Sequence, residues 1–395
     1  MSAAPLHDPA ESDPQPVGDG PGYLPRQLVL LGAGQAHMHT LAQLAKHPLV
    51  GARVVLVAPY AGQIYARMLP GLLAGHYQHE DCVIPLEPLV RRSGVQWLSR
   101  SVRRLDAQAR TLQLDDGSTL PYDWLSINTG PVQNRALLEQ SIPGAREHGL
   151  FLRPMESFAA LWPKVAEMAD ARALRFTVIG AGAGGVEIAM ALRQRFASSS
   201  VTLLSGQQLP ASDFPAAFQL KVLAALNARR ITLIREAAVA IRAGEVVLAS
   251  GASLACDVPL LSTGPQAAAW LQDSGLALDE AGFVAVDSCQ RSRSHPQVFA
   301  TGDVSSRSDR ALARNGHAAQ RAGPALDFNL RACVHGTALK PHQPPQRTLS
   351  LLSCGDQRAI ASWGRWSAQG RWVWWLKNWL DRRVVARFKT DPKQY

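Results

Sequence analysis

Apolar and polar positions follow each other along this chain in an order that repeats. A short apolar stretch at 28–31 runs into a glycine-rich turn, and an Ala- and Leu-rich stretch with helical spacing follows at 36–46. A second apolar stretch comes at 53–58. Short apolar runs bounded by turn residues predict strands, and the longer periodic stretch predicts a helix. This part of the chain therefore predicts a strand–helix–strand unit.

The same order returns in the second half of the chain. A strand with its glycine turn, a helix and a second strand are predicted again, at 176–182, 185–196 and 201–205. Both halves then carry short β-rich segments with turn signals, and both close on the tripeptide Thr-Gly-Pro, at 129–131 and 263–265. The shared order and closing tripeptide indicate that residues 26–150 and 174–270 are two copies of one unit.

The turn after the first strand of each copy has the spacing of a dinucleotide-binding loop. The second copy has all three glycines of the G-x-G-x-x-G pattern, Gly180, Gly182 and Gly185. The first copy has Gly32 and Gly34, but His37 replaces the third glycine. The first two glycines allow the tight turn and the approach of a pyrophosphate to the helix N-terminus, and the third lets helix and strand pack closely. Two such loops, each between a strand and a helix, predict two nucleotide sites, with the helix at His37 pushed slightly outward.

The strand that follows each loop lacks the acidic residue that usually ends it. Ala58-Pro59 and Ser205-Gly206 stand where an Asp or Glu would bind a ribose 2′-hydroxyl. No arginine stands beside Ser205 in the sequence to bind a 2′-phosphate. The sequence therefore leaves the choice between NAD and NADP open.

Length and composition agree with two or three ordinary domains. The chain has 395 residues, of which 47% are hydrophobic and 18% charged. Residues 1–24 contain five prolines and four acids but no Lys or Arg, which predicts a disordered tail. No signal peptide and no run of 18 apolar residues is found, so we expect a cytoplasmic protein without a membrane-spanning helix.

Cysteine and histidine spacings give no metal or disulfide motif. The five cysteines are scattered without a C-x-x-C pair, which favours reduced, buried thiols. His76 and His79 have the spacing of a metal-binding pair, but no further ligands stand nearby at suitable spacing. The sequence therefore predicts no metal site.

The C-terminal segment is basic and rich in tryptophan. Residues 364–395 hold eight bases and two acids, a charge of +6 out of the net +10. A helix through 371–388 would gather six apolar residues on one face: Trp372, Trp375, Leu376, Trp379, Leu380 and Val384. Such a helix suits peripheral contact, through 371–389, with the inner face of the cell membrane. Packing on the chain's own sheet or in a homodimer fits the pattern equally, whereas no nucleic-acid-binding module is present.

Together with "VFATGDVSS" at 298–306, the two units give the sequence a clear resemblance. It resembles the two-dinucleotide-domain flavoproteins of the pyridine nucleotide-disulfide oxidoreductase type. More narrowly, it is similar to type II NADH dehydrogenase-like proteins and to the module fused in some proteins to selenide, water dikinase. The matching stretches are "GAGQAHMHTL", "YARMLPGLLAGHY", "YDWLSINTG", "GDQRAIASWG" and "WLKNWLDRR".

The resemblance implies an α/β fold with two Rossmann-like domains, the second inserted in the first. Each domain would carry a small β meander, and a C-terminal β/α region would cap them. The implied division is a tail at 1–24, an FAD-binding domain at 25–155 and 286–335, an NAD(P)H-binding domain at 156–285, and the C-terminal region at 336–395.

The resemblance also implies which residues hold the cofactors. FAD would be held by Gly32, Ala33, Gly34, Gln35, Ala36, His37, Met68, Leu69, Pro70, Thr129, Gly130, Gly302, Asp303 and Gly316. NAD(P)H would be held by Gly180, Gly182, Gly185, Val186, Glu187, Thr263 and Gly264. Asp303 would bond the flavin's ribityl chain, and the helix near Gly316 would aim its positive N-terminus at the flavin ring. Glu187 would lie near the nicotinamide ribose, or else be an ordinary acid in a first helical turn.

The implied reaction is hydride transfer from NAD(P)H to flavin N5, followed by electron transfer to a quinone or another small acceptor. Two departures from the narrower family are Gln35, where histidine is usual, and Arg67, where small residues are usual. Arg67 would alter access to the flavin, so the acceptor stays open. Two alternatives are a non-catalytic, NAD(P)H-responsive flavoprotein that acts through a partner, and a sulfide or selenium-compound oxidoreductase that uses Cys82.

Overall fold

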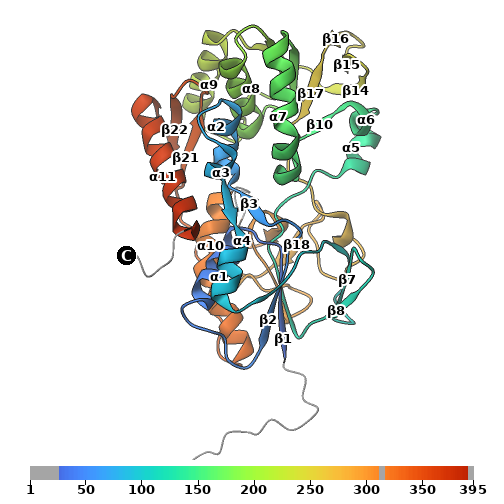
Figure 1. The fold of residues 1–395 in the computed structure, drawn as a ribbon, viewed down its shortest axis with the longest axis vertical. Coiled ribbons are helices and arrows are strands. Elements are labelled where there is room, and N and C mark those ends of the chain that lie inside the picture. Colours follow the sequence, from blue (N-terminus) through green and yellow to red (C-terminus); the bar gives the residue numbers. More distant parts are fainter. Residues whose placement is uncertain (1–25, 311–315, 390–395) are drawn as a thin grey trace, which may run out of the picture.

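The computed structural model describes residues 26–310 and 316–389, so the tail predicted at 1–24 lies outside it. The described chain forms two α/β halves stacked along the longest axis of the molecule. The first half is in the lower part of Figure 1 and the second in the upper part, and the C-terminal segment runs along one side of both.

Each half is built on a five-stranded parallel sheet. The first sheet has the order β19 (Val298–Ala300), β9 (Trp124–Ile127), β1 (Gln27–Leu31), β2 (Arg53–Val57) and β5 (Gln96–Leu98). The second sheet has the order β10 (Leu150–Phe151), β17 (Val258–Leu261), β11 (Arg175–Ile179), β12 (Ser200–Leu204) and β13 (Thr232–Ile234). Continuous apolar runs form these strands because both faces of each sheet are covered, one by helices and the other largely by antiparallel strands.

The two halves repeat in detail. Helix α1 (Gln35–Leu44) follows β1, and helix α8 (Ala183–Arg195) follows β11. Each half also has an antiparallel meander, made of β6 (Val102–Asp106), β7 (Thr111–Leu114) and β8 (Thr119–Pro121), and of β14 (Ala238–Arg242), β15 (Glu245–Leu248) and β16 (Ser253–Ala255). The first strand pair of each meander shifts register near its start. A bulge kept at the same place supports the prediction of two copies of one unit.

The second unit lies within the sequence of the first. Strand β19 comes after the whole second sheet, yet it pairs with β9 at the edge of the first sheet. This topology confirms the predicted α/β class and the insertion. The domain boundaries at 155, 285 and 335 stay predictions.

The remaining elements connect and cover the sheets. In the first half they are β3 (Gly62–Ile64), η1 (Ala66–Met68), α2 (Leu69–Leu73), α3 (His79–Cys82), β4 (Val83–Pro85) and α4 (Leu86–Ser93). Between the halves and in the second half they are α5 (Arg135–Ser141), α6 (Ala145–His148), α7 (Met155–Ala171) and α9 (Ala216–Ala228). The return to the first half comprises η2 (Ala269–Leu271), β18 (Val284–Val286), η3 (Gly302–Val304), β20 (Ser305–Arg307) and α10 (Gly316–Val334).

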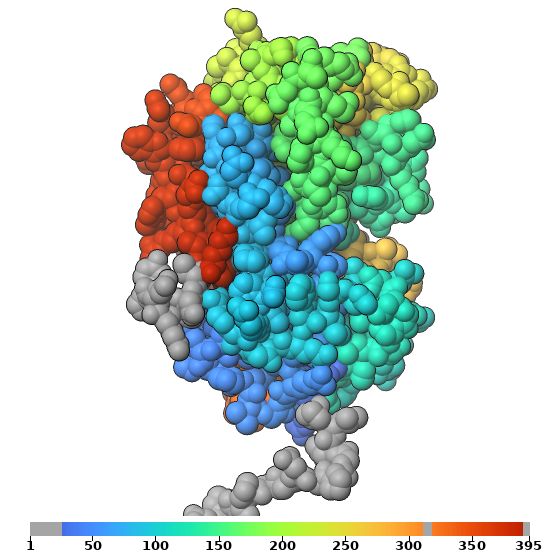
Figure 2. All heavy atoms as spheres, viewed as in Figure 1, coloured from blue at the N-terminus to red at the C-terminus, as the bar shows by residue number. Residues whose placement is uncertain are grey.

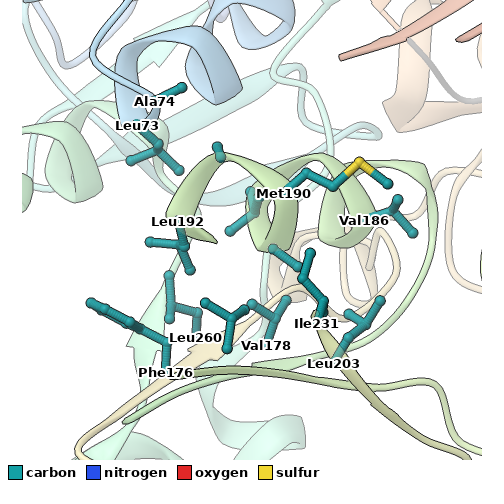
Figure 3. Close-up of a cluster of buried hydrophobic side chains, with 14 of the residues drawn as sticks. Leu73, Ala74, Phe176, Val178, Val186, Met190, Leu192, Leu203, Ile231 and Leu260 are labelled. Carbon is teal, nitrogen blue, oxygen red and sulfur yellow. The ribbon is translucent and has the colours of Figure 1, made fainter. Parts of the chain in front are cut away.

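The core of the second half also receives residues from the first. Phe176, Val178 and Leu260 on the sheet belong to one apolar cluster with Met190 and Leu192 of α8, as Figure 3 shows. Leu73 and Ala74, which come from α2 and its end, join the same cluster. The two halves are therefore packed against each other through apolar contacts.

The C-terminal region is a three-stranded meander followed by a long helix. It consists of β21 (Leu349–Ser353), β22 (Ala359–Trp363), β23 (Trp366–Gly370) and α11 (Arg371–Lys389). Leu352 and Ile360 enter the core of the second half, whereas Val385 and Phe388 enter that of the first. The region thus bridges the two halves along one side, as Figure 2 also shows.

Helix α11 turns three of its four tryptophans outward. Trp372, Trp375 and Trp379 are each more than half exposed. The buried face carries a different set of residues, Val373, Lys377, Asp381, Val385 and Phe388. Packing of those three tryptophans on the chain's own sheet, one of the predicted alternatives, is therefore wrong. Within the described ranges no helix has the length and apolar character needed to cross a membrane.

Candidate functional site

The first glycine turn closes tightly against the end of strand β9. Gly32 has a φ of +86°, and a Cβ there would lie 2.7 Å from the Asn128 carbonyl oxygen, so only glycine fits. A Cβ at Gly34 would lie 2.3 Å from the Asn128 side-chain oxygen. In this copy, contact with Asn128 therefore requires the second glycine. In the second copy a Cβ at Gly182 would meet no atom within 4 Å, so that position faces open space.

Asn128 ties three distant segments together and was not singled out from the sequence. Its Oδ1 accepts hydrogen bonds from the backbone N–H groups of Ala36 (3.1 Å) and His37 (3.3 Å) at the start of α1. Its Nδ2 donates to the carbonyl oxygen of Thr301 at 2.7 Å. The available signal was an amide directly before the first Thr-Gly-Pro, where the second copy has Ser262.

His37 is a buried structural residue, and its imidazole is not available to a phosphate. Nδ1 lies 2.6 Å from the Gly32 carbonyl oxygen, and Nε2 lies 2.7 Å from the Ser126 hydroxyl. Because a carbonyl only accepts, Nδ1 carries the hydrogen, and Nε2 of the neutral ring accepts from Ser126. Burial lowers the pKa of His37 to about 4, although the bond to Gly32 acts in the opposite direction.

In the second copy the third position of the fingerprint is a glycine, Gly185, which lets the helix pack closely on the turn. A Cβ at Gly185 would lie 1.9 Å from the Gly180 carbonyl oxygen, so α8 sits directly on the turn. In the first copy the His37 ring occupies the corresponding place and hydrogen-bonds the equivalent carbonyl of Gly32. The first fingerprint is thus interrupted by a residue that hydrogen-bonds the carbonyl oxygen against which bare helix backbone packs in the second copy.

The two Thr-Gly-Pro segments meet each other. Val132 and Gln266, each two residues beyond the glycine of its tripeptide, form an antiparallel bridge with N–H···O distances of 3.0 and 3.1 Å. Gln133 donates to the carbonyl oxygen of Leu261 at 2.7 Å. A Cβ at Gly130 or Gly264 would meet nothing within 4 Å. The closing ends of both copies therefore lie side by side and border open space.

The Gly-Asp turn returns to the same edge of the first sheet. The Thr301 N–H donates to the Ile127 carbonyl at 3.0 Å, and Gly302 adopts a φ of +75°. A Cβ at Gly302 would lie 2.9 Å from the Asn128 side chain and 3.1 Å from Ala319 of α10. The turn that contains Asp303 thus lies beside the first glycine turn, with α10, which begins at Gly316, next to it.

Several predicted contact residues have buried side chains. Ala33, Ala36 and Val186 lie in or against the cores, and so do Met68 and Leu69. Pro70 is buried as well. These side chains support the packing of α1, α2 and α8, so contact with a nucleotide is left to their backbone. In the segment 65–71, Ala66 is exposed and Arg67 is partly exposed.

A cluster of charges, two of them buried and two partly exposed, lies where that segment, α8 and α11 meet. Arg67 Nε lies 2.9 Å from Asp381 Oδ1, and Lys377 Nζ lies 2.8 Å from Asp381 Oδ2. Lys377 also donates to the Arg67 carbonyl oxygen at 2.7 Å. We call Arg67, Lys377, Asp381 and Glu187 the charged cluster. Lys377 and Asp381 were not predicted as site residues, although their i, i+4 spacing on a predicted helix was a usable signal.

Glu187 faces the other three residues of the charged cluster from the first turns of α8. Its Oε1 accepts a hydrogen bond from the Ser353 N–H at 2.7 Å. Burial raises the pKa of Glu187, and the charges of Lys377 and Arg67 act in the opposite direction. Glu187 is therefore more than an acid favoured by a helix dipole, because it contacts the C-terminal meander and faces buried cations.

The side chains of Cys82 and His76 are held inside the fold, Cys82 by burial and His76 by a hydrogen bond and a ring contact. Cys82 is fully buried, and burial raises its pKa to about 12, so its thiol is a poor nucleophile. His76 Nε2 lies 2.6 Å from the Gly355 carbonyl oxygen, and its ring packs edge-on against Trp374. No group of three metal-ligating side chains occurs in the described part of the chain.

The glycine turns fit the diphosphate of a dinucleotide. Gly130, Gly182 and Gly264 leave open space in front of the turns. The Oε1 atom of Gln35, in the first turn of α1, is buried without a hydrogen-bond partner among the described residues. Helix N-termini with glycine backbone are suited to phosphate. The Gln35 Oε1 is an acceptor, so it fits a donor group of a ligand such as a hydroxyl and not a phosphate oxygen.

Two stacked dinucleotide-binding folds with a returning Gly-Asp turn define a class of flavoproteins that hold two dinucleotides. The chain belongs to the pyridine nucleotide-disulphide oxidoreductase family, whose model matches residues 26–323. It is accordingly an FAD-dependent oxidoreductase with NAD(P)H as its nucleotide substrate. The narrower similarity to the module fused to selenide, water dikinase stays a prediction.

Curated relatives align over most of the chain. A demethylphylloquinone reductase, NdbB, of Synechocystis sp. is 25% identical over 352 residues, which are 83% of this chain and 85% of the relative. An alternative NAD(P)H-ubiquinone oxidoreductase, C1, of Arabidopsis thaliana is 23% identical over 363 residues, which are 80% of this chain and 69% of the relative.

Solved structures share the fold. NDH2 from Plasmodium falciparum, in complex with NADH, gives a TM-score of 0.77 at 13% identity and covers 94% of this chain and 99% of its own. The sulfide:quinone oxidoreductase from Aquifex aeolicus gives 0.76 at 16% identity and covers 92% of this chain and 91% of its own. These likenesses support the predicted two-domain α/β architecture.

Proposed function

We propose that the protein passes electrons from NAD(P)H to a quinone, with FAD as the carrier between them. One observation carries the proposal. The closing ends of the two dinucleotide units meet at the Val132–Gln266 bridge, so two bound dinucleotides would share one site. The relatives named for demethylphylloquinone and ubiquinone reduction support a quinone as the acceptor.

The chain's own residues would bind, orient and hold protons. FAD supplies the two-electron chemistry when bound. The turns at Gly32 and Gly180 would orient the two diphosphates, and Asn128 would fix the Gly-Asp turn beside them. Reduction of a quinone takes up two protons, and burial, which raises the pKa of Glu187, favours a protonated carboxyl there that would hold one of them.

Anaerobic flavin reduction tests the proposal. We expect NAD(P)H to bleach the flavin absorbance of the purified protein, and a soluble quinone to restore it over many turnovers. Gly185→Ala forces a Cβ against the Gly180 carbonyl at 1.9 Å and should prevent reduction by the nucleotide. Dithionite should still reduce the bound flavin of this variant. That result would show that the FAD site is intact. Flavin that stays reduced after one equivalent, with no quinone turnover, would support the sensor alternative.

We further propose that the tryptophans of the C-terminal region contact a membrane surface. Trp363 and Trp366 in the β22–β23 hairpin are exposed, as are Trp372, Trp375 and Trp379 on α11. The Arg383 guanidinium lies over the Trp379 ring, 5.2 Å from its centroid. Aromatic side chains beside basic ones suit the interface of an anionic bilayer, which is where a quinone is available.

Vesicle sedimentation separates a membrane from a second copy of the chain. The wild-type protein should sediment with vesicles of 30% anionic lipid, and the variant with Trp372, Trp375 and Trp379 changed to Ser should not. Leu161 and Leu220, which are exposed on α7 and α9, give the matched control when changed to Ser. Light scattering that shows a dimer lost in the tryptophan variant, without vesicle binding, would instead favour the predicted homodimer.

A further inference from the structure

The end of strand β12 lies directly beside the second glycine turn. The Gly180 N–H donates to the Leu204 carbonyl at 2.9 Å. The following segment then folds back over the turn, because the Ala211 N–H donates to the Ala181 carbonyl at 2.8 Å. In a dinucleotide-binding unit, this strand end and the residues just after it face the ribose of the adenosine.

Strand β13 brings a cation to this place that the sequence pattern of β12 does not reveal. The backbone of Ser205 and Gly206 pairs with that of Ile234 and Glu236, at 3.0 and 3.1 Å. Arg235 lies between those two partners, and its Nη2 donates to the Gln207 carbonyl at 3.1 Å. The guanidinium is therefore held just beyond the end of β12, where the sequence alone showed no arginine.

The charge of Arg235 is available to a ligand. Arg235 is exposed and forms no salt bridge with an acid in the described ranges. The neighbouring Glu236 is engaged elsewhere, because its Oε2 accepts from the Ser250 N–H at 3.0 Å. Ser205 stands where an acid would repel a phosphate. A guanidinium has five donors in a fork that matches phosphate oxygens, and Gln207 occupies one of them.

We infer that Arg235 binds the 2′-phosphate of NADPH, so that NADPH is the preferred hydride donor over NADH. Ser205 contributes by removing the carboxylate that would otherwise select the free 2′-hydroxyl. This inference rests on the proposed function and specifies its donor. Arg235 is a specificity-determining residue in it, far from the reacting atoms.

Binding of nucleotide fragments tests the inference without any redox reaction. Adenosine 2′,5′-bisphosphate and adenosine 5′-monophosphate differ only in the 2′-phosphate. By calorimetry we expect the bisphosphate to bind about 10-fold to 100-fold more tightly, the range of a charge-assisted hydrogen bond. Arg235→Gln should remove the difference. Arg230→Gln, an exposed arginine at the opposite end of β13, should retain it.

Steady-state kinetics give an independent readout. In Arg235→Gln the KM for NADPH should rise at least about tenfold with kcat unchanged, because a remote contact contributes equally to substrate and transition-state binding. The KM for NADH should stay the same. Ser205→Glu should shift the preference toward NADH.

Two results would overturn the inference. One is equal affinity of the wild-type protein for the two fragments. The other is an equal rise in the KM for NADH and the KM for NADPH in Arg235→Gln. Failure of the proposed function would give a different result from failure of this inference. In that case the bisphosphate still binds more tightly, yet neither nucleotide reduces the flavin.

Discussion

At the scale of single residues, His37 joins helix α1 to the sheet beneath it. Its ring contacts the Gly32 carbonyl and the Ser126 hydroxyl inside the core. His37→Gly would restore the glycine of the fingerprint and yet leave both groups buried without a partner. We expect a loss of about 2–4 kcal/mol in the free energy of unfolding, measured by chemical denaturation. His47→Gly, at an exposed position just beyond α1, is the control, and equal losses in the two variants would contradict this role.

The neutral state of His37 makes stability depend on pH. The unfolded chain protonates near pH 6.5, whereas the folded chain protonates only near pH 4. Stability that is fully present above pH 6.5 is therefore lost as the pH falls toward 4, by about 3 kcal/mol. Denaturation curves across this range should show a smaller decline in His37→Gln. An identical decline in variant and wild type would assign the pH dependence to other groups.

At the scale of elements, one carboxylate holds α11 to the segment at 65–71. Asp381 pairs with both Arg67 and Lys377 in a buried setting. Asp381→Asn would leave two cations without a carboxylate between them, so we expect a loss of about 3–5 kcal/mol in the free energy of unfolding. Asp81→Asn breaks the more exposed pair with Arg382 and should cost about 1 kcal/mol or less. Similar losses for both variants would show that the buried pair is not what holds the helix.

At the scale of the whole molecule, the C-terminal region fastens the two halves to each other. Its residues enter both cores, and Phe388 is fully buried against the first sheet's helices. Phe388→Ala should cost about 3–5 kcal/mol and lower one common unfolding transition. Trp379→Ala on the exposed face should change stability by about 0.5 kcal/mol or less. Calorimetry that resolves two separate transitions in the wild-type chain would contradict this coupling.

Much of this architecture could be predicted from the sequence because it follows from local patterns. Apolar strands, glycine turns and helical stretches recur in two copies, and the strands lie within a residue or two of their predicted positions. The insertion was predicted from the family resemblance, which the Gly302-Asp303 turn after the second copy helps to carry. The positive φ angles of Gly32 (+86°) and Gly180 (+110°) are local requirements, so a short pattern records them.

The rest could not be predicted because it depends on contacts between distant segments. Asn128 acts through bonds to residues more than 90 positions away. The partners of Lys377 and Asp381 include Arg67, which lies on a different element. Arg235 reaches the second nucleotide site from the neighbouring strand, so an inspection of β12 and its flanks alone did not reveal it. An outward face of tryptophans also has the same sequence pattern as an inward one.

The ring of His37 has a consequence for how such proteins are found and redesigned. The third position of the fingerprint is usually taken to require glycine, which has no side chain. Here the first copy shows another arrangement, in which an imidazole hydrogen-bonds the carbonyl oxygen that lies against bare backbone in the second copy. Searches that demand three glycines will pass over chains with the second solution, and designers gain a position where a titratable group can be placed inside a nucleotide-binding fold.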